Sequence, residues 1–387
     1  MPARNLLALP AVCLMFIGAL HSATAQVRPA AKEPRSDLAD ALSPIEWSRV
    51  DQAIDRAFIW LAENQNPDGS FPTIASGQPA VTSLGVMAFL SRGHQPGADL
   101  YGDRLNRAID YVLECQQPSG LFSLGVPQPH HVHMGFSHTA TYNHAIAGLM
   151  LSEAYGQVDR QRAAKIEKAI NAALQMTGRI QDEPTKRNAE DHGGWRYVRR
   201  FGGSMSDSDL SVTGWHLMFL RSAKNAQFAV PDEMVDDAVK YVQRCFVESQ
   251  GGFVYGLTGS DRYVSRGTMG VGALSLALAG KHQTRMAQQV GDWLIRHPFD
   301  TYGQITNARD RFHYSAYYCS NAMAQLGGHY WRQTFPTLAK TLLENQSADG
   351  SWGSESGEDR MYGPAYPTAL SVLTLTPAYQ LLPIYQR

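Results

Sequence analysis

The sequence predicts an all-α protein, an α/α toroid built from about six helical-hairpin repeats. A turn of the form Gln-x-x-Asp-Gly-Ser-aromatic closes a helical pattern near both ends of the chain, at residues 65–71 and 346–352, and weaker copies lie between them. The segments between the turns are apolar on nearly all sides, as helices buried between neighbours should be. Patterns typical of strands are nearly absent. Together these observations favour a ring of helix pairs.

The turns divide the chain into units of about 50 residues, enough for two helices and their loops. The longest unit carries an insertion at residues 179–194, which is expected to form a loop on the rim of the ring. The aromatic residues that close the turns are Phe71, Phe122, Trp195, Phe253, Tyr302 and Trp352.

Each unit is predicted to pair an outer amphipathic helix with an inner apolar one. The first outer helix begins at Ser43-Pro44-Ile45-Glu46, a capping box with proline at the first helical position. Ile54, Phe58 and Leu61 then follow at i, i+4 and i+7 on one face. The predicted inner helices cover residues 81–91, 142–156, 210–223, 268–280, 315–328 and 367–375.

The N-terminus has the pattern of an export signal. Arg4 supplies a positive charge, residues 6–20 are apolar, and Ala23-Thr24-Ala25 is a small-residue cleavage site. The apolar stretch is short for a transmembrane helix, which favours a cleaved signal and leaves an uncleaved anchor as the alternative; no later segment could span a bilayer. The sequence therefore predicts a signal peptide over 1–25, a flexible leader over 26–42, a domain over 43–387 and a periplasmic, cell-surface or secreted location.

Composition excludes several partners and chemistries. The 34 basic and 35 acidic residues leave a formal charge of −1 with no basic stripe, so nucleic-acid binding is not expected. Without the signal peptide three cysteines remain, an odd number that gives no disulfide framework. Phosphate-loop, Rossmann and HExxH patterns are absent, and no cofactor is expected.

The turns resemble the QW repeats of squalene and oxidosqualene cyclases and of the β subunits of protein prenyltransferases. The similarity runs from about residue 45 to 385, because the repeat recurs through that span. It implies the α/α toroid fold and an isoprenoid-like apolar ligand in a central cavity. The residues that carry it most clearly are Gln65, Gly69, Phe71, Gln346, Gly350 and Trp352.

Two aspartates are the candidate catalytic residues. In the cyclases a GGW turn precedes a D-x-D-D-T-A motif whose central aspartate protonates the substrate, and Asp209 aligns with it through Asp207-Ser208-Asp209 after the turn at Trp195. Leu210 and Ser211 stand where the family has Asp and Thr, so the site is short of one carboxylate. Either aspartate can equally be the N-cap of the following helix, and the two roles are compatible.

Aromatic and histidine side chains near the starts of the inner helices are the candidate ligand contacts. Such rings can line a cavity, hold an isoprenoid chain and stabilise carbocations, although they can equally belong to the core. The segment around His313 faintly resembles the one that carries the zinc-binding histidine of protein prenyltransferases, but no Asp-x-Cys pair completes that zinc site. The candidates are Tyr142, His144, Trp195, Tyr197, Trp215, His313, Tyr314 and Tyr317.

Residues 129–144 are rich in histidine. Neutral imidazoles at this density can bind Zn or Cu, but no cysteine or nearby carboxylate completes a usual ligand set and the spacing is irregular. No metal site is therefore predicted, and the segment is interpreted as a loop on the rim or beside the cavity.

The leading hypothesis is an exported protein that binds or transforms an isoprenoid-like ligand in a central cavity, with Asp209 as its acid. Two alternatives stay open at this point: a non-catalytic secreted scaffold that uses the toroid rim, and a polysaccharide lyase or hydrolase. The nature of the cavity discriminates between them. The residues that the carbohydrate hypothesis needs in one groove are Arg196, Arg199, Arg200, Asp191 and Asp207.

Overall fold

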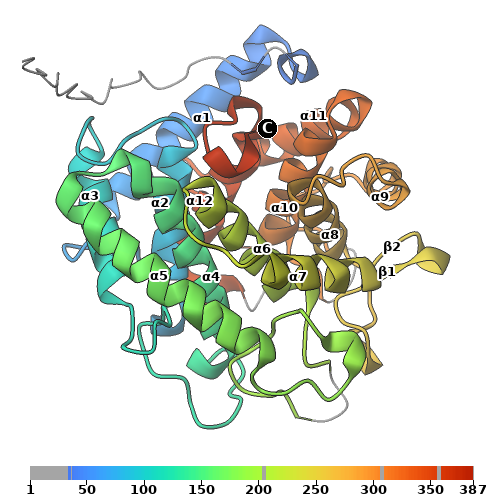
Figure 1. Ribbon diagram of the computed structural model, residues 1–387. Helices are drawn as coiled ribbons and strands as arrows, with labels where there is room; N and C mark the ends of the chain where they lie inside the picture. Colours follow the sequence, from blue (N-terminus) through green and yellow to red (C-terminus); the bar gives the residue numbers. More distant parts are fainter. Residues whose placement is uncertain (1–33, 36, 203–205, 306–308, 355–358, 387) are drawn as a thin grey trace, which may run out of the picture.

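The computed structural model describes residues 34, 35, 37–202, 206–305, 309–354 and 359–386. The expected signal peptide lies outside them. Within this part of the chain, twelve α-helices alternate between an inner and an outer position and form a closed double ring (Figure 1). The predicted all-α toroid is confirmed.

Six helices form the inner ring. Each packs against the inner helix before it and the one after it, and α12 returns to α2, which closes the circle. Nearly every residue of these helices is buried, in agreement with their uniformly apolar sequences. The inner helices are α2 (Ala80–Leu90), α4 (Phe136–Ala154), α6 (Leu210–Asn225), α8 (Arg266–Leu278), α10 (Phe312–Leu326) and α12 (Ala365–Leu375).

Six amphipathic helices form the outer layer. In the first of them the capping box at Ser43 and Glu46 is present, and Ile54, Phe58 and Leu61 are buried against the inner ring. The outer helices are α1 (Pro44–Glu63), α3 (Gly102–Glu114), α5 (Arg160–Asp182), α7 (Asp232–Arg244), α9 (Arg285–Arg296) and α11 (Gly328–Glu344).

Short elements complete the described chain. Strands β1 (Phe246–Val247) and β2 (Gly252–Phe253) pair antiparallel. The 3-10 helices are η1 (Ala39–Ala41), η2 (Ala75–Gly77), η3 (Tyr155–Gln157), η4 (Ala189–Asp191), η5 (Glu248–Gln250), η6 (Gly259–Asp261), η7 (Asp359–Tyr362), η8 (Pro377–Tyr379) and η9 (Pro383–Tyr385). No helix of the described residues has the length and apolar character needed to cross a bilayer.

The repeated turns fasten neighbouring units together. The side-chain amide of Gln65 donates to the carbonyl oxygens of Gly69, in its own turn, and Arg104, on the next outer helix, both at 2.9 Å. Gly69 has φ +92°, and a Cβ there would lie 2.4 Å from the carbonyl oxygen of Arg107. Only glycine therefore allows the turn to pack this closely against α3.

A second contact ties most of the turns to the inner helix of their own unit. The backbone N–H of the aromatic residue donates to a side chain on that helix, usually a threonine hydroxyl. The bonded pairs are Phe71 with Thr82, Trp195 with Thr213 and Trp352 with Thr368, each at 3.0 Å, and Phe122 with the Nδ1 of His144 at 3.2 Å. His144 thus takes the place that threonine has in three other units.

Residues 37–42, just before α1, pack against the folded domain although most of them are polar or small. Leu38 is 1% exposed, and its carbonyl oxygen accepts a hydrogen bond from the indole of Trp331 on α11 at 2.9 Å. Residues 37–42 are therefore part of the folded unit, whereas the sequence predicted a flexible leader as far as residue 42. Two apolar side chains, Leu38 and Leu42, supply the buried contacts.

Candidate functional site

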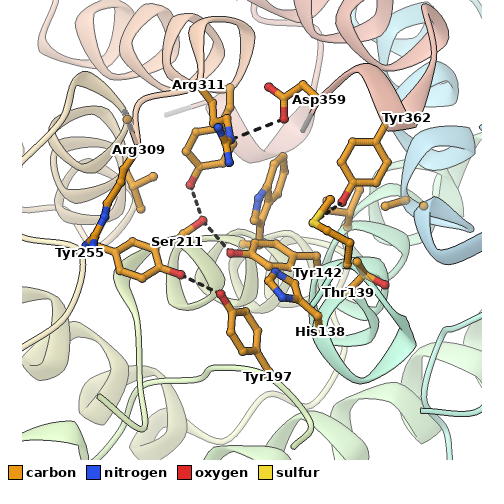
Figure 2. Close-up of a pocket in the computed structure, with 18 of the residues that line it drawn as sticks. His138, Thr139, Tyr142, Tyr197, Ser211, Tyr255, Arg309, Arg311, Asp359 and Tyr362 are labelled. Carbon is orange, nitrogen blue, oxygen red and sulfur yellow. Dashed lines mark hydrogen bonds and ion pairs between the residues drawn. The ribbon is translucent and has the colours of Figure 1, made fainter. Parts of the chain in front are cut away.

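A cavity of about 420 Å³ lies at the end of the ring where the inner helices begin. All six inner helices contribute residues from their N-terminal halves, and the loops that precede them complete the wall. Figure 2 shows how these side chains converge from separate elements. The toroid therefore places residues from the whole chain around one space.

The cavity wall is rich in aromatic rings. Aliphatic side chains of α2, α4 and α8 lie between them, among them Val81, Ile146 and Val271. Such a lining suits an apolar ligand, and ring faces attract positive charge. The aromatic lining residues outside the histidines are Tyr142, Tyr197, Phe201, Trp215, Tyr255, Tyr263, Tyr314, Tyr362 and Tyr366.

Tyrosine hydroxyls form hydrogen bonds along the wall (Figure 2). The Ser211 hydroxyl accepts from Tyr142 at 3.2 Å and is 2.7 Å from the Tyr314 hydroxyl. The hydroxyls of Tyr197 and Tyr255 lie 3.2 Å apart. Burial raises the pKa of Tyr197 to about 12, so its hydroxyl keeps its proton at neutral pH.

Four charged groups of the wall lie in ion pairs. Arg196 is 8% exposed, lies 2.7 Å from the Asp261 carboxylate, and its Nε is 3.6 Å from Asp209 Oδ2. Arg311 lies 3.6 Å from Asp359. Two cation and carboxylate pairs are therefore available beside an otherwise aromatic surface.

Asp209 is the N-cap of α6 and is fully buried. Its Oδ1 accepts a hydrogen bond from the Val212 N–H at 2.8 Å, while Oδ2 has no hydrogen-bond partner among the described residues. Burial raises its pKa to about 6, and the charge of Arg196 opposes that shift. Asp209 does not line the cavity, but its neighbours Arg196 and Tyr255 do.

Asp207 fastens the inserted loop and does not line the cavity. Its carboxylate accepts from the Arg187 guanidinium at 2.7 and 2.8 Å and from the Arg187 backbone N–H at 2.8 Å. Burial alone would raise its pKa, but the bonds and charge of Arg187 outweigh burial and lower it. Asp207 is thus ionised, and both of its carboxylate oxygens already accept hydrogen bonds from Arg187. This contact holds the loop in place and differs from the acid role suggested by the sequence.

Of the eight predicted ligand contacts, Tyr142, Tyr197, Trp215 and Tyr314 line the cavity. The other four lie behind the wall, each in a structural contact. The Trp195 indole donates to Thr177 O at 2.9 Å, and His144 Nε2 lies 3.0 Å from the Thr177 hydroxyl. His313 bonds Tyr302 at 3.1 Å, and Tyr317 bonds Tyr385 at 2.8 Å.

Several cavity residues were not predicted as site residues. Ser211 and Tyr255 flank the candidate acid, and Ser211 could have been found as the side chain one helical turn before Trp215 on the same inner helix. Arg309, Arg311 and Asp359 lie in connecting segments, where charged residues are usually solvated. Sequence patterns offer no signal for these three.

The sequence has recognisable relatives. A family model described as the prenyltransferase alpha-alpha toroid domain matches residues 80–303 and 204–384. A drimenyl diphosphate synthase from Streptomyces showdoensis is 28% identical over 120 residues, which are 30% of this chain and 20% of that protein. The chain therefore matches well under two thirds of that relative's length.

Solved structures share the architecture at low identity. A variant of the type II terpene cyclase MstE from Scytonema, in complex with its product merosterolic acid A, superposes with a TM-score of 0.54 at 16% identity, covering 88% of this chain and 100% of that one. A GH76 α-mannanase from Bacteroides thetaiotaomicron gives 0.57 at 10% identity, covering 86% and 96%. Because terpene cyclases and glycosidases both match, these likenesses show the fold alone.

Proposed function

The chain belongs to the prenyltransferase alpha-alpha toroid family, and from that premise we propose that it binds an isoprenoid-type ligand in its central cavity and acts on it with Asp209 as the acid. The observation that carries the proposal is the aromatic cavity itself. Its volume of about 420 Å³ falls within the range of about 300–1,000 Å³ for small-molecule pockets.

The cavity wall suits both the binding of an isoprenoid chain and the stabilisation of positive charge that forms on it. An apolar chain would pack against Trp215, Ile146 and Val271, which lie on three successive inner helices. Positive charge that develops on the ligand would be stabilised by the faces of the surrounding tyrosine rings. MstE has been crystallised with geranylgeranyl dihydroxybenzoate as its substrate, which makes this ligand class a reasonable one to test here.

Asp209 would deliver its proton through Tyr255. Burial keeps a fraction of the Asp209 carboxyl protonated near neutral pH, and the Tyr255 side chain interacts with that carboxyl and lines the cavity. In this step Tyr255 gives its hydroxyl proton to the ligand and takes the proton of Asp209. The carboxylate that remains is stabilised by Arg196, 3.6 Å away.

A second pocket does bring together four of the five residues needed by the carbohydrate alternative: Arg196, Arg199, Arg200 and Asp207. Its volume of about 10 Å³ has room for about one water molecule, so it is not a groove for a sugar chain. Of that set, Arg196 lines the cavity, but it is already paired with Asp261 and Asp209. Asp191 instead accepts from the Asp207 N–H at 2.8 Å, within the inserted loop. A cavity in the ring also favours a small-molecule ligand over a scaffold that uses only the rim.

The decisive experiment combines binding and turnover. Purified protein would be incubated with squalene, farnesyl diphosphate and geranylgeranyl diphosphate, and bound or converted lipid measured by mass spectrometry. Asp209→Asn keeps an oxygen to cap α6, so the variant should fold and bind ligand but lose conversion. Asp207→Asn is the matched control and should retain conversion. Failure of all three lipids to bind, or equal conversion by Asp209→Asn, would contradict the proposal.

We also infer that the protein is exported, with cleavage after Ala25. Residues 1–25 support this by sequence alone: a positive start, an apolar stretch and a small-residue site. N-terminal sequencing of protein expressed with its own leader should begin at Gln26. Retention of Met1 on the purified protein would contradict the inference.

A further inference from the structure

Three histidines gather beside the cavity. His138 lies in the first turn of α4, and His131 and His133 lie in the loop before it. Each offers one ring nitrogen, and these three atoms all lie within 4.8 Å of one another. His133 and His138 also line the cavity wall. The fold therefore brings together three histidines that could bind one metal ion. Their irregular spacing in the sequence did not suggest this.

The backbone of the loop holds this arrangement in place. The N–H of Val132, the residue between the two loop histidines, donates to the Ser137 hydroxyl at 2.8 Å. The N–H of Ser137 in turn donates to the side-chain oxygen of Gln128 at 2.7 Å. Both loop histidines are thus tied to the start of α4, where His138 lies.

Ring nitrogens of the cluster have unused bonding capacity. Both ring nitrogens of His131 and the Nδ1 of His138 are buried without a hydrogen-bond partner among the described residues. Buried polar atoms normally find a partner, so unpaired ones call for an explanation. Tyr197 stacks on both rings, at 5.1 Å from His131 and 4.1 Å from His138, and fixes their orientation.

The protonation state of the buried rings suits metal binding. Burial lowers the pKa of His131 and lowers that of His138 to about 3. Both imidazoles are therefore neutral at neutral pH, which is the form that binds a metal.

We propose that His131, His133 and His138 bind one divalent transition metal ion, Zn²⁺ or Cu²⁺, at the wall of the cavity. Three imidazoles suit these metals, whereas Mg²⁺ and Ca²⁺ prefer oxygen ligands. Three protein ligands leave a fourth position for water or a ligand, the arrangement of catalytic rather than structural zinc. The site is independent of the isoprenoid proposal, because it uses none of the residues of the Asp209 relay.

The test uses tag-free full-length protein, stripped of metal with a chelator. Zn²⁺ binding would be measured by isothermal titration calorimetry, and Co²⁺ substitution would be followed by visible absorption. His133→Ala is the principal variant because His133 is exposed and its loss should not affect folding. His131→Ala is the second. His130→Ala is the matched control: it removes an exposed histidine of the same loop that lies outside the cluster.

The expected result is one metal per chain, tetrahedral Co²⁺ absorption, and an affinity that falls at least tenfold in His133→Ala and His131→Ala but is unchanged in His130→Ala. Absence of stoichiometric binding by the unaltered protein would overturn the proposal. So would an equal loss of affinity in His130→Ala and His133→Ala, because binding would then be a general property of the loop.

Discussion

The two ends of the inner ring differ in what fills them. Where the inner helices end, the C-terminal segment packs against the ring: η8 contacts α10 and α12, and η9 contacts α6 (Figure 1). Tyr385 bonds Tyr317 at 2.8 Å there, and Gln325 donates to the Tyr385 carbonyl oxygen at 3.1 Å. Where the inner helices begin, the same ring surrounds a cavity.

Polar groups at the two ends have different environments. At the filled end the buried Glu153 carboxylate accepts from the Ser222 hydroxyl and from the Ile384 N–H at 3.3 Å, so both of its oxygens are used. At the cavity end, Asp209 Oδ2 and the His131 ring nitrogens lack such partners among the described residues. We therefore expect substitutions of uncharged residues to affect mainly stability at the filled end and mainly ligand binding at the cavity end.

The largest effect on stability should come from Tyr385, whose side chain lies at the filled end of the ring. Tyr385→Ala leaves a hole beside α6 and α10 and leaves the Tyr317 hydroxyl with only a 4.0 Å contact to Met218 Sδ, at an expected cost of about 4 kcal/mol in the free energy of unfolding. Tyr366→Ala, in the cavity wall, should cost about 1 kcal/mol because its ring is already partly exposed. Urea unfolding of both variants measures the difference, and equal losses would remove the distinction between the ends.

The second effect on stability should come from Arg196, a buried cation of the cavity wall that lies beside two carboxylates. Arg196→Met leaves Asp209 and Asp261 without their cation and should cost about 3 kcal/mol at pH 8. Arg196 lowers the pKa of Asp209, so its removal lets burial raise that pKa further. A carboxyl with a raised folded-state pKa loses stability as pH rises, so the deficit should shrink at pH 5.

Unfolding of Arg196→Met at both pH values tests this expectation. Arg311→Met is the control, since its pair with Asp359 is 28% exposed at the arginine and should be worth about 1 kcal/mol or less. A deficit in Arg196→Met that does not depend on pH would show that the lost contacts are not electrostatic.

A smaller, pH-dependent effect is expected at the filled end. Burial raises the pKa of Glu153 to about 7, from an unfolded value of 4.5. The stability linked to this carboxyl is fully present below about pH 4.5 and is lost as pH rises through 7, because the folded state resists ionisation. Glu153→Gln stays neutral and should therefore be about 1–3 kcal/mol more stable than the unaltered protein at pH 8.5.

The melting temperatures of Glu153→Gln and the unaltered protein, compared at pH 5 and pH 8.5, measure this. The two should nearly coincide at pH 5 and separate at pH 8.5. A constant difference, or a lower melting temperature for Glu153→Gln at pH 8.5, would show that Glu153 is stabilised in its ionised form.

The fold could be predicted because it repeats. Turns such as those at Gln65 and Gln346 recur with the same bonds to a neighbouring outer helix, so a few residues establish the number of units and the alternation of helices. Local packing rules act in the same way in every unit. The part of the N-terminus that packs on α11 was missed because Leu38 and Leu42 are only two apolar residues in a polar segment.

The site could be predicted only in part, because a residue's position on an inner helix does not say whether it faces the cavity or the next helix. Tyr314 and Tyr317 lie one turn apart on α10, yet the first lines the cavity and the second bonds the C-terminal segment. His144 looked like a ligand contact, but it replaces a threonine of the repeat. The histidine cluster depends on how one loop folds back, which spacing alone does not encode.

The smallest effect on stability should distinguish two serines, Ser222 at the filled end of the ring and Ser211 at the cavity end. Ser222→Ala removes a hydroxyl that donates to the buried Glu153 carboxylate, so an oxygen is left unpaired, at an expected cost of about 1–2 kcal/mol. Ser211→Ala removes the partner of Tyr142 and Tyr314, but both hydroxyls face the cavity and can bond water instead. Its cost should stay below about 1 kcal/mol, while its affinity for prenyl diphosphates changes. If Ser211→Ala proves the more destabilising of the two, the cavity hydroxyls serve the fold rather than a ligand.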